Sequence, residues 1–180
     1  SGQVVGYSDT ASGQTHATLW SGGSVYDLGV LEYWSYAWDI NNVGQAVGYS
    51  FSGAYYRAFF WEGGVISALG PADTYSTASG INDSGQVAGM VMGPTGWYAA
   101  LWEDGALYDL NSLITPGSGW TLVQANDINN RGQIVGYGQV GGENHAFLLT
   151  PTNTVPAPGA FLLAIFGAAT AAAVRRVRQR

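Results

Sequence analysis

Short apolar stretches alternate with turn-forming residues along residues 1–150. Val, Ile, Tyr, Phe and Trp gather in runs of about four to eight residues, and Gly, Asn, Asp and Ser separate the runs. Stretches such as Ala58-Phe59-Phe60-Trp61 are typical of β-strands, while Gly-Gly and Asn-x-Gly pairs favour tight reversals. The pattern predicts an all-β region built from short antiparallel strands.

The strand pattern is itself repeated four times. Gly-Gln followed by two apolar residues recurs with offsets of 42, 41 and 47 between the glycines, and Ile-Asn-Asn or Ile-Asn-Asp precedes three of the copies. Asn and Asp tolerate turn dihedrals, and Gly supplies the positive φ that a turn with a bulge requires. The predicted turn residues are Gly2, Asn42, Gly44, Asp83, Gly85, Asn130 and Gly132.

Each unit of about 42 residues contains three clear strands and a weaker one, such as residues 37–40. Four-stranded antiparallel units at this spacing are typical of β-propeller blades, and a unit this short needs neighbours to cover its apolar face. We expect a propeller-like fold with units near 1–34, 35–75, 76–121 and 122–150. A β-solenoid or prism is the alternative.

The number of repeats does not decide whether these units form a closed ring. The first copy lacks its leading strand and the fourth its trailing one, which predicts either a four-bladed ring closed by strand exchange or the last blades of a larger propeller. The second is favoured. We therefore expect more repeat sequence and a signal peptide before Ser1.

A second sequence box follows each Gly-Gln pair by 13 or 14 residues. It reads His-Ala-Thr-Leu-Trp at residues 16–20, Arg-Ala-Phe-Phe-Trp at 57–61, Tyr-Ala-Ala-Leu-Trp at 98–102 and His-Ala-Phe-Leu-Leu at 145–149. Residues 1–150 resemble the bacterial extracellular HAF repeat, whose tripeptide appears here as His145-Ala146-Phe147. The resemblance implies an exported repeat protein and says little about activity.

The last 26 residues have a different composition. Residues 155–158 form a Pro-containing segment within the linker 151–158, residues 159–174 are an apolar run, and residues 175–180 are basic. As a helix the 16 apolar residues would be roughly 24 Å long, which spans a bilayer with local thinning. We expect a transmembrane helix at 159–174 and an Arg-rich cytoplasmic tail, with the residues before them outside the cytoplasm.

This tail resembles the PEP-CTERM sorting signal of Gram-negative, exopolysaccharide-producing bacteria. Val155, Pro156 and Pro158 match the sorting motif, with Ala157 where many members carry Glu, and the basic tail contains Arg175, Arg176, Arg178 and Arg180. The resemblance implies processing by a membrane protease or transpeptidase, an exosortase. It also implies passage through the inner membrane to the cell surface or extracellular matrix.

Charge separates the repeats from the tail. All 12 acidic residues precede residue 155, whereas Arg57 and Arg131 are the only bases there, so residues 1–154 carry a formal charge of −10. A strongly acidic region is repelled by phosphate backbones, and we expect no nucleic-acid partner. The absence of Cys excludes disulfides and cysteine metal sites.

No residue set predicts catalysis. His16 and His145 share a repeat position with Arg57 and Tyr98, which favours a structural role, and no nucleophile elbow or sialidase Asp box is present. The acid pairs Asp27 with Asp109 and Asp39 with Asp127 also occupy matching repeat positions. We predict no catalytic residue, no metal site and no cofactor, with a structural Ca²⁺ ion in the turns as the alternative.

The aromatic residues divide into two groups. Trp20, Trp61 and Trp102 share one repeat position and are predicted to lie in the core. A second group lies where the copies differ: Trp34, Trp38, Tyr55, Tyr56, Trp97 and Trp120. Aromatic side chains on the variable loops of a scaffold often stack on sugar rings, and we take Trp34, Trp97 and Trp120 as candidate stacking residues.

The sequence therefore favours an exported, non-catalytic protein of the cell surface or exopolysaccharide matrix. Its expected partners are extracellular polysaccharide or other proteins, an exosortase-type enzyme, and the membrane, through residues 159–174, before processing. Two alternatives remain. One is a propeller glycoside hydrolase or lyase with its catalytic residues upstream, and the other is a binding module anchored in the inner membrane and facing the periplasm.

Overall fold

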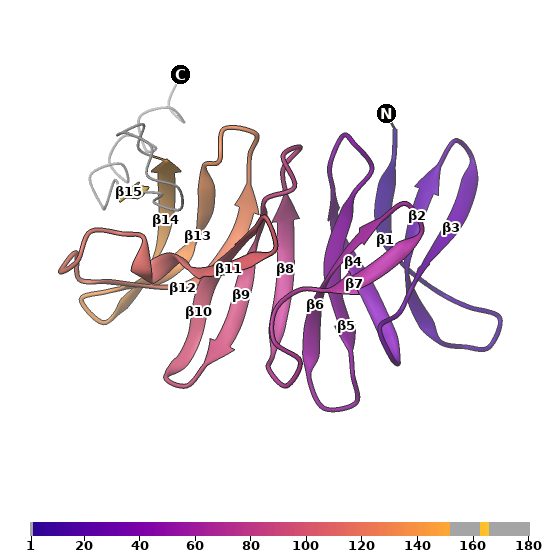
Figure 1. Ribbon diagram of the computed structural model, residues 1–180, viewed down its shortest axis with the longest axis horizontal. Coiled ribbons are helices and arrows are strands. Elements are labelled where there is room, and N and C mark those ends of the chain that lie inside the picture. Colours follow the sequence, from indigo (N-terminus) through magenta and orange to yellow (C-terminus); the bar gives the residue numbers. More distant parts are fainter. Residues whose placement is uncertain (1, 152–162, 166–180) are drawn as a thin grey trace, which may run out of the picture.

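The computed structural model describes residues 2–151 and 163–165, and these residues form four antiparallel sheets. The sheets follow one another in chain order from the N-terminal to the C-terminal end of the molecule (Figure 1). In the described residues the only helical element is the 3₁₀ turn η1 (Leu110–Ser112). The predicted all-β fold class is confirmed, and each repeat corresponds to one sheet.

Every sheet is an up-and-down meander in which strands adjacent in sequence pair with each other. The first contains β1 (Val4–Asp9), β2 (Thr15–Ser21) and β3 (Ser24–Gly29), and the second contains β4 (Trp34–Ile40), β5 (Ala46–Phe51), β6 (Tyr56–Glu62) and β7 (Val65–Ala68). The third contains β8 (Ser76–Ile81), β9 (Val87–Gly93), β10 (Gly96–Glu103) and β11 (Ala106–Asp109). The fourth contains β12 (Trp120–Ile128), β13 (Ile134–Val140), β14 (Glu143–Pro151) and β15 (Leu163–Ile165).

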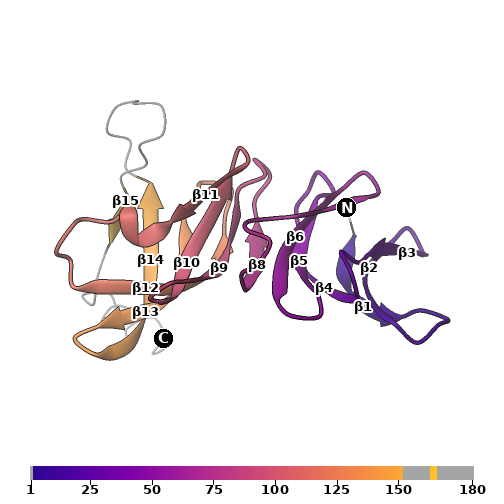
Figure 2. The same ribbon diagram turned by 60° about the horizontal axis from the view of Figure 1, so that its bottom comes forward.

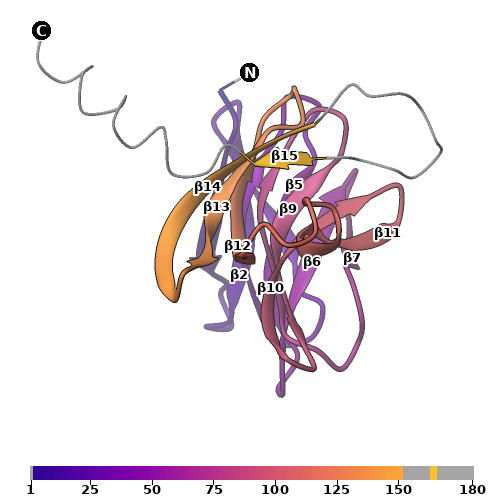
Figure 3. The ribbon, with the colours of Figure 1, turned by 90° about the vertical axis from the view of Figure 1, so that its left-hand side faces the viewer.

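Three apolar clusters hold the sheets together, one between each successive pair. Leu19 and Phe59 belong to the cluster between the first two sheets, Val47 and Val91 to the next, and Leu101 belongs to the third cluster with residues of the fourth sheet. Viewed along the stack, the sheets overlap and the outer strands β7 and β11 lie on the same side (Figure 3). No sheet has a core of its own, because each buries its apolar faces against its neighbours.

The first strands of the three complete sheets lie side by side. β8 contacts β4 on one side and β12 on the other, and the order of the sheets is also visible in Figure 2. Each of these strands contains a register shift, between Ala37 and Asp39 in β4 and between Ala78 and Gly80 in β8, with two in β12. A bulge adds local twist to its strand, so each of the three strands is twisted at the point of its register shift.

The bulges explain the glycine that recurs in the second strand of the last three sheets. A Cβ on Gly48, Gly89 or Gly136 would overlap the backbone carbonyl oxygen of Tyr36, Thr77 or Gln124, respectively. Only glycine permits this approach of two backbones. The repeated Val-Gly and Ala-Gly pairs thus result from contact between neighbouring strands rather than from a turn.

The C-terminal segment differs from expectation where the structure describes it. Leu163–Ile165 form β15, an antiparallel strand on β14, although these residues lie in the predicted transmembrane helix. The free edge of β14 supplies backbone hydrogen-bonding partners to this segment, and the fourth sheet thereby gains the trailing strand that its repeat was expected to lack. Among the described residues, no helix has the length and apolar character needed to cross a membrane.

The remaining C-terminal predictions lie outside the described residues. These are the sorting motif Val155, Pro156 and Pro158, the rest of the 159–174 segment, and the basic tail Arg175, Arg176, Arg178 and Arg180.

Candidate ligand-binding groove

The predicted turn residues of the last three repeats connect the first and second strands of their sheets, at the top of Figure 1, and Gly2 precedes β1. Gly44, Gly85 and Gly132 have φ values of 88°, 77° and 71°, and Gly2 has a φ of 68°. In each turn after β4, β8 and β12, an Asn side chain accepts bonds from the backbone N–H groups two and four residues later. Positive φ at these positions is the conformation that glycine adopts without strain.

Hydrogen bonds also join each of these turns to the next. The amide Nδ2 of Asn41 donates to the carbonyl oxygen of Asn82 at 2.9 Å, and Asn82 donates in the same way to Asn129 at 3.1 Å. The Asp83 carboxylate accepts from the Asn42 backbone N–H at 2.9 Å and from the Asn130 side chain at 2.7 Å. The Asn-rich turns therefore form a ladder that links the second, third and fourth sheets.

A groove of about 590 Å³ lies across the neighbouring first strands of these sheets. Its residues come from β4, β5, β6, β8, β9 and β12, and they alternate along the first strands because side chains of a strand point to opposite faces. The lining residues are Trp38, Tyr49, Tyr56, Thr77, Ser79, Met90, Gln124 and Asn126. Three repeats contribute to one surface.

Aromatic rings form one wall of this groove. Trp38 is 57% exposed and lies 6.1 Å from Tyr49, measured between ring centroids. Behind it, Tyr49 stacks on Tyr36 at 5.5 Å and meets Tyr56 edge-on at 5.4 Å. Packing against several rings limits the motion of Tyr49, so it is a rigid support beside an exposed indole face.

The groove is electrically neutral at its surface. Hydroxyls and amides are its polar groups, and none of the lining residues is charged. Burial, followed by the neighbouring phenols of Tyr36, Tyr56 and Tyr7, raises the pKa of Tyr49, so its hydroxyl stays protonated at neutral pH.

The carboxylates of residues next to the groove lining accept hydrogen bonds from backbone N–H groups. Asp39 follows Trp38 in β4, and its two oxygens accept from the backbone N–H groups of Ile40 and Ile81, each at 2.8 Å. Asp127 follows Asn126 and accepts from the Ile128 N–H at 2.7 Å. Glycosidases need two carboxyl groups facing the substrate, and the lining of this groove provides none.

The three Trp residues predicted to stack on sugars each contact another aromatic ring. Trp34 is half-buried and stacks on Phe51 at 5.0 Å, Trp97 contacts Tyr75 at 6.2 Å, and Trp120 contacts His145 at 6.3 Å. None of the three lines the groove. The exposed Trp38, from the same group of variable aromatics, lines it instead.

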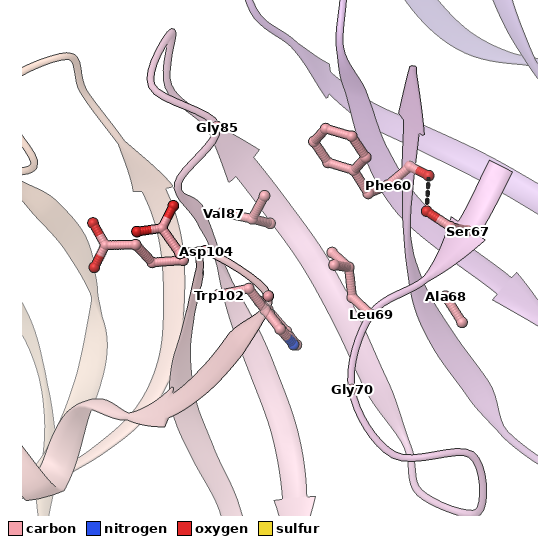
Figure 4. Close-up of a pocket in the computed structure, with 11 residues that line it drawn as sticks. Phe60, Ser67, Ala68, Leu69, Gly70, Gly85, Val87, Trp102 and Asp104 are labelled. Atoms are coloured by element: carbon pink, nitrogen blue, oxygen red, sulfur yellow. Dashed lines mark hydrogen bonds between the residues drawn. The ribbon is translucent and has the colours of Figure 1, made fainter. Parts of the chain in front are cut away.

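The Trp residues that share one repeat position are not buried to the same extent. Trp102 is only 4% exposed, whereas its equivalent Trp20 is 36% exposed, so the prediction of a core position is wrong for Trp20. Trp102 borders a hollow of about 370 Å³ between the second and third sheets, together with Leu69 and Gly70 (Figure 4). In the described part of the chain, its indole N–H has no hydrogen-bond acceptor.

His16 contacts an acidic residue of β3, the last strand of its sheet. His16 Nδ1 lies 2.8 Å from a carboxylate oxygen of Asp27. In the third repeat Tyr98 and Asp109 take the same two positions, and burial, followed by the Asp109 charge, raises the pKa of Tyr98. The His16–Asp27 contact joins β2 to β3.

Acidic side chains and histidines do not cluster as metal ligands in residues 2–151. No group of three or more of them is close enough to hold an ion there. The absence of a cofactor and the alternative of a structural calcium ion both stay predictions.

Comparisons with known proteins identify no family. No family model and no curated protein matches the chain. A solved structure of a puromycin-hydrolyzing peptidase from Mycobacterium tuberculosis is similar over 79% of this chain and 23% of its own, with 14% identity and a TM-score of 0.45. This chain thus spans less than a quarter of that peptidase, and neither the fold nor the activity of the peptidase is transferred to it.

Proposed function

We propose that this protein is an exported, non-catalytic component of the cell surface or extracellular matrix that binds uncharged polysaccharide in the groove beside Trp38. The observation that carries the proposal is an exposed indole, supported by packed tyrosines and facing neutral hydroxyl and amide groups. An aromatic face packs on the apolar face of a sugar ring, while amides and hydroxyls bond its hydroxyl groups.

The dimensions of the groove favour a chain over a single sugar. Its lining comes from three sheets in succession, and its volume of about 590 Å³ is within the range of ligand sites in proteins. A groove lined by three successive repeats offers contacts to more than one sugar of a chain. A binding role is favoured over hydrolysis because the neighbouring acids Asp39 and Asp127 already bond to the backbone.

Binding is tested by replacing the exposed indole. We expect Trp38→Ala to weaken binding to the host's own matrix polysaccharide at least about tenfold in affinity electrophoresis, since stacking on the ring would be lost. Trp20→Ala is the matched control because Trp20 is also exposed, at 36%, but lies on β2 away from the groove. Equal binding by both variants would reject the groove as the site.

The three Trp residues that the sequence suggested as sugar-stacking residues allow a separate test of where the ligand binds. Joint replacement of Trp34, Trp97 and Trp120 by Ala should have less effect on binding than Trp38→Ala, because these three side chains are half-buried against other rings. A larger loss in the folded triple variant would place the ligand at the strand ends instead of in the groove.

We also propose that the four sheets are blades of a propeller-like fold and that the C-terminal segment directs export. The contacts of β8 with β4 and β12 and the up-and-down meanders support the first point. Mass spectrometry of the native protein from matrix and membrane fractions tests the second. Loss of residues 159–180 from matrix protein would support sorting by an exosortase-type enzyme, whereas an intact end in the inner membrane would indicate a permanent anchor.

A further inference from the structure

A series of aromatic rings continues from the groove along the second and third sheets. Tyr56, which lines the groove and is 40% exposed, lies 5.8 Å from Tyr75, measured between ring centroids. Tyr75 lies 5.0 Å from Tyr55 and 6.2 Å from Trp97. Tyr55, Tyr75 and Trp97 are partly exposed, and we call these three residues together with Tyr56 the aromatic belt. The belt thus begins at a residue of the groove and leads away from it.

Strand pairing places the far end of the belt on the groove face of the third sheet. Trp97 is paired with Met92, whose backbone N–H donates to the carbonyl oxygen of Tyr75 at 2.9 Å. Thr77 and Met90, which line the groove, are paired with each other two residues away. Because residues two apart in a strand share a face, Met92 and Trp97 lie on the same face as Met90, one row from the groove.

Strand pairing does not require an aromatic residue at the positions of the belt. Tyr56 and Trp97 occupy the same repeat position, directly before the second sequence box, and the first and fourth repeats have Thr15 and Asn144 there. Thr15 and Asn144 pair with the neighbouring strand just as Tyr56 and Trp97 do. The rings of the second and third repeats are therefore additions to a scaffold that forms without them.

The spacing and chemistry of the rings suit consecutive units of a sugar chain. From Tyr49 in the groove, successive ring centroids lie 5.4 Å away at Tyr56, then 5.8 Å at Tyr75 and 6.2 Å at Trp97. Each step is close to the length of one sugar unit in an extended chain. Tyr and Trp rings pack on the apolar face of a sugar, and their polar tips bond its hydroxyl groups. Like the groove lining, the belt contains no acidic or basic residue, which favours a neutral chain.

We propose that the aromatic belt is a second binding subsite, which continues the groove and binds further sugars of the same neutral polysaccharide chain. This inference rests on the proposed function of the groove. Trp38 binds one segment of the chain, and Tyr75 and Trp97 bind the next segment along it. A short oligosaccharide occupies only the groove, whereas a longer one also gains the contacts of the belt, so affinity rises with chain length until the chain reaches Trp97.

Oligosaccharides of graded length, prepared from the host's own matrix polysaccharide, test this subsite by isothermal titration calorimetry. We expect the affinity of the unaltered protein to rise with chain length and then to level off. Trp97→Ala should weaken the binding of long oligosaccharides about fivefold and leave that of short ones unchanged, since only long chains reach the belt. Trp38→Ala should weaken binding at every length, because every chain occupies the groove.

Trp120→Ala is the matched control for Trp97→Ala. Trp120 is also partly exposed and contacts the ring of His145, but it belongs to neither the groove nor the belt. We expect this variant to bind oligosaccharides of every length as the unaltered protein does. Tyr75→Leu keeps an apolar side chain in the belt, and it tests the same dependence on length if thermal unfolding shows that Trp97→Ala does not fold.

The outcomes separate the belt from the groove. Equal affinity for short and long chains would overturn the belt, as would folded belt variants that bind long chains normally or lose short and long chains equally. In these cases weaker binding by Trp38→Ala would leave the groove in place. Unchanged binding by Trp38→Ala would instead reject the groove, and with it the belt as its continuation.

Discussion

At the scale of single residues, glycines of this chain have two different physical roles. Gly44, Gly85 and Gly132 take positive φ in the turns, whereas Gly48, Gly89 and Gly136 make space for the carbonyl of a neighbouring strand. Both sets recur at the repeat spacing, so sequence alone identifies their recurrence. Only the contacts distinguish a conformational requirement from a steric one.

Replacement of Gly48 by Ala should be strongly destabilising. The Cβ would overlap the Tyr36 carbonyl, which is backbone and can move only if the sheet distorts. We expect a loss of about 2 kcal/mol or more in the free energy of unfolding, measured by denaturant titration. Gly6→Ala is the matched control at the same repeat position, and equal stability losses in the two variants would contradict the explanation.

Asp83 should make the stability dependent on pH in the acid range. Hydrogen bonds from the Asn42 side chain and backbone, with a further one from Asn130, lower the pKa of Asp83 in the folded state. The carboxylate therefore adds stability above its unfolded pKa, and this contribution is lost as pH falls through the lower folded pKa.

The conservative variant Asp83→Asn tests this dependence. Asn occupies the equivalent positions 42 and 130, so the turn tolerates it. We expect the thermal midpoint of the original protein to fall more steeply than that of the variant as pH is lowered from about 5 to about 3. Parallel curves would show that the bonds of Asp83 do not contribute to stability.

At the scale of elements, the Asn-rich turn is a connector between sheets as well as a reversal of the chain. Asn82 is 3% exposed and makes four side-chain bonds, three within its turn and one to the Asn129 carbonyl. The sequence signal Ile-Asn-Asp-x-Gly predicts the reversal correctly. It carries no information about the bond between turns, because that partner lies 47 residues away.

Asn82→Ala and Asn129→Ala separate these two roles. Asn129 makes the bonds within its turn but donates to no further turn among the described residues, and it is exposed. We expect Asn82→Ala to lower the free energy of unfolding by about 2–3 kcal/mol and Asn129→Ala by about half as much, because buried partners left unpaired carry the larger cost. Equal losses would mean that the bond between turns adds nothing.

At the scale of the whole molecule, stability depends on stacking. Every buried cluster combines residues of two successive sheets, so a single repeat leaves both of its apolar faces in water. The same stacking aligns β4, β8 and β12 and creates the groove between them. Stability and the groove that we propose as a binding site thus both depend on contacts between repeats.

A single repeat should therefore not fold. We expect a fragment of residues 71–112, which holds the third sheet, to lack the dispersed amide resonances of a folded protein in NMR spectra at 25 °C, whereas the parent chain shows them. A cooperatively folded fragment would show that one sheet is stable without its neighbours.

The sequence by itself determined the all-β class, the four repeats and the positions of the turns, because these follow from local propensities and from periodic apolar residues. It did not determine which aromatic residues line the groove. Trp34 and Trp38 are four positions apart in one strand, yet neighbouring rings cover Trp34 while Trp38 faces the groove. The tertiary structure decided this, and also that Gly48 lies against the Tyr36 carbonyl while Gly6 lies against the Trp20 ring. Both outcomes depend on strands and sheets that pack from distant parts of the chain.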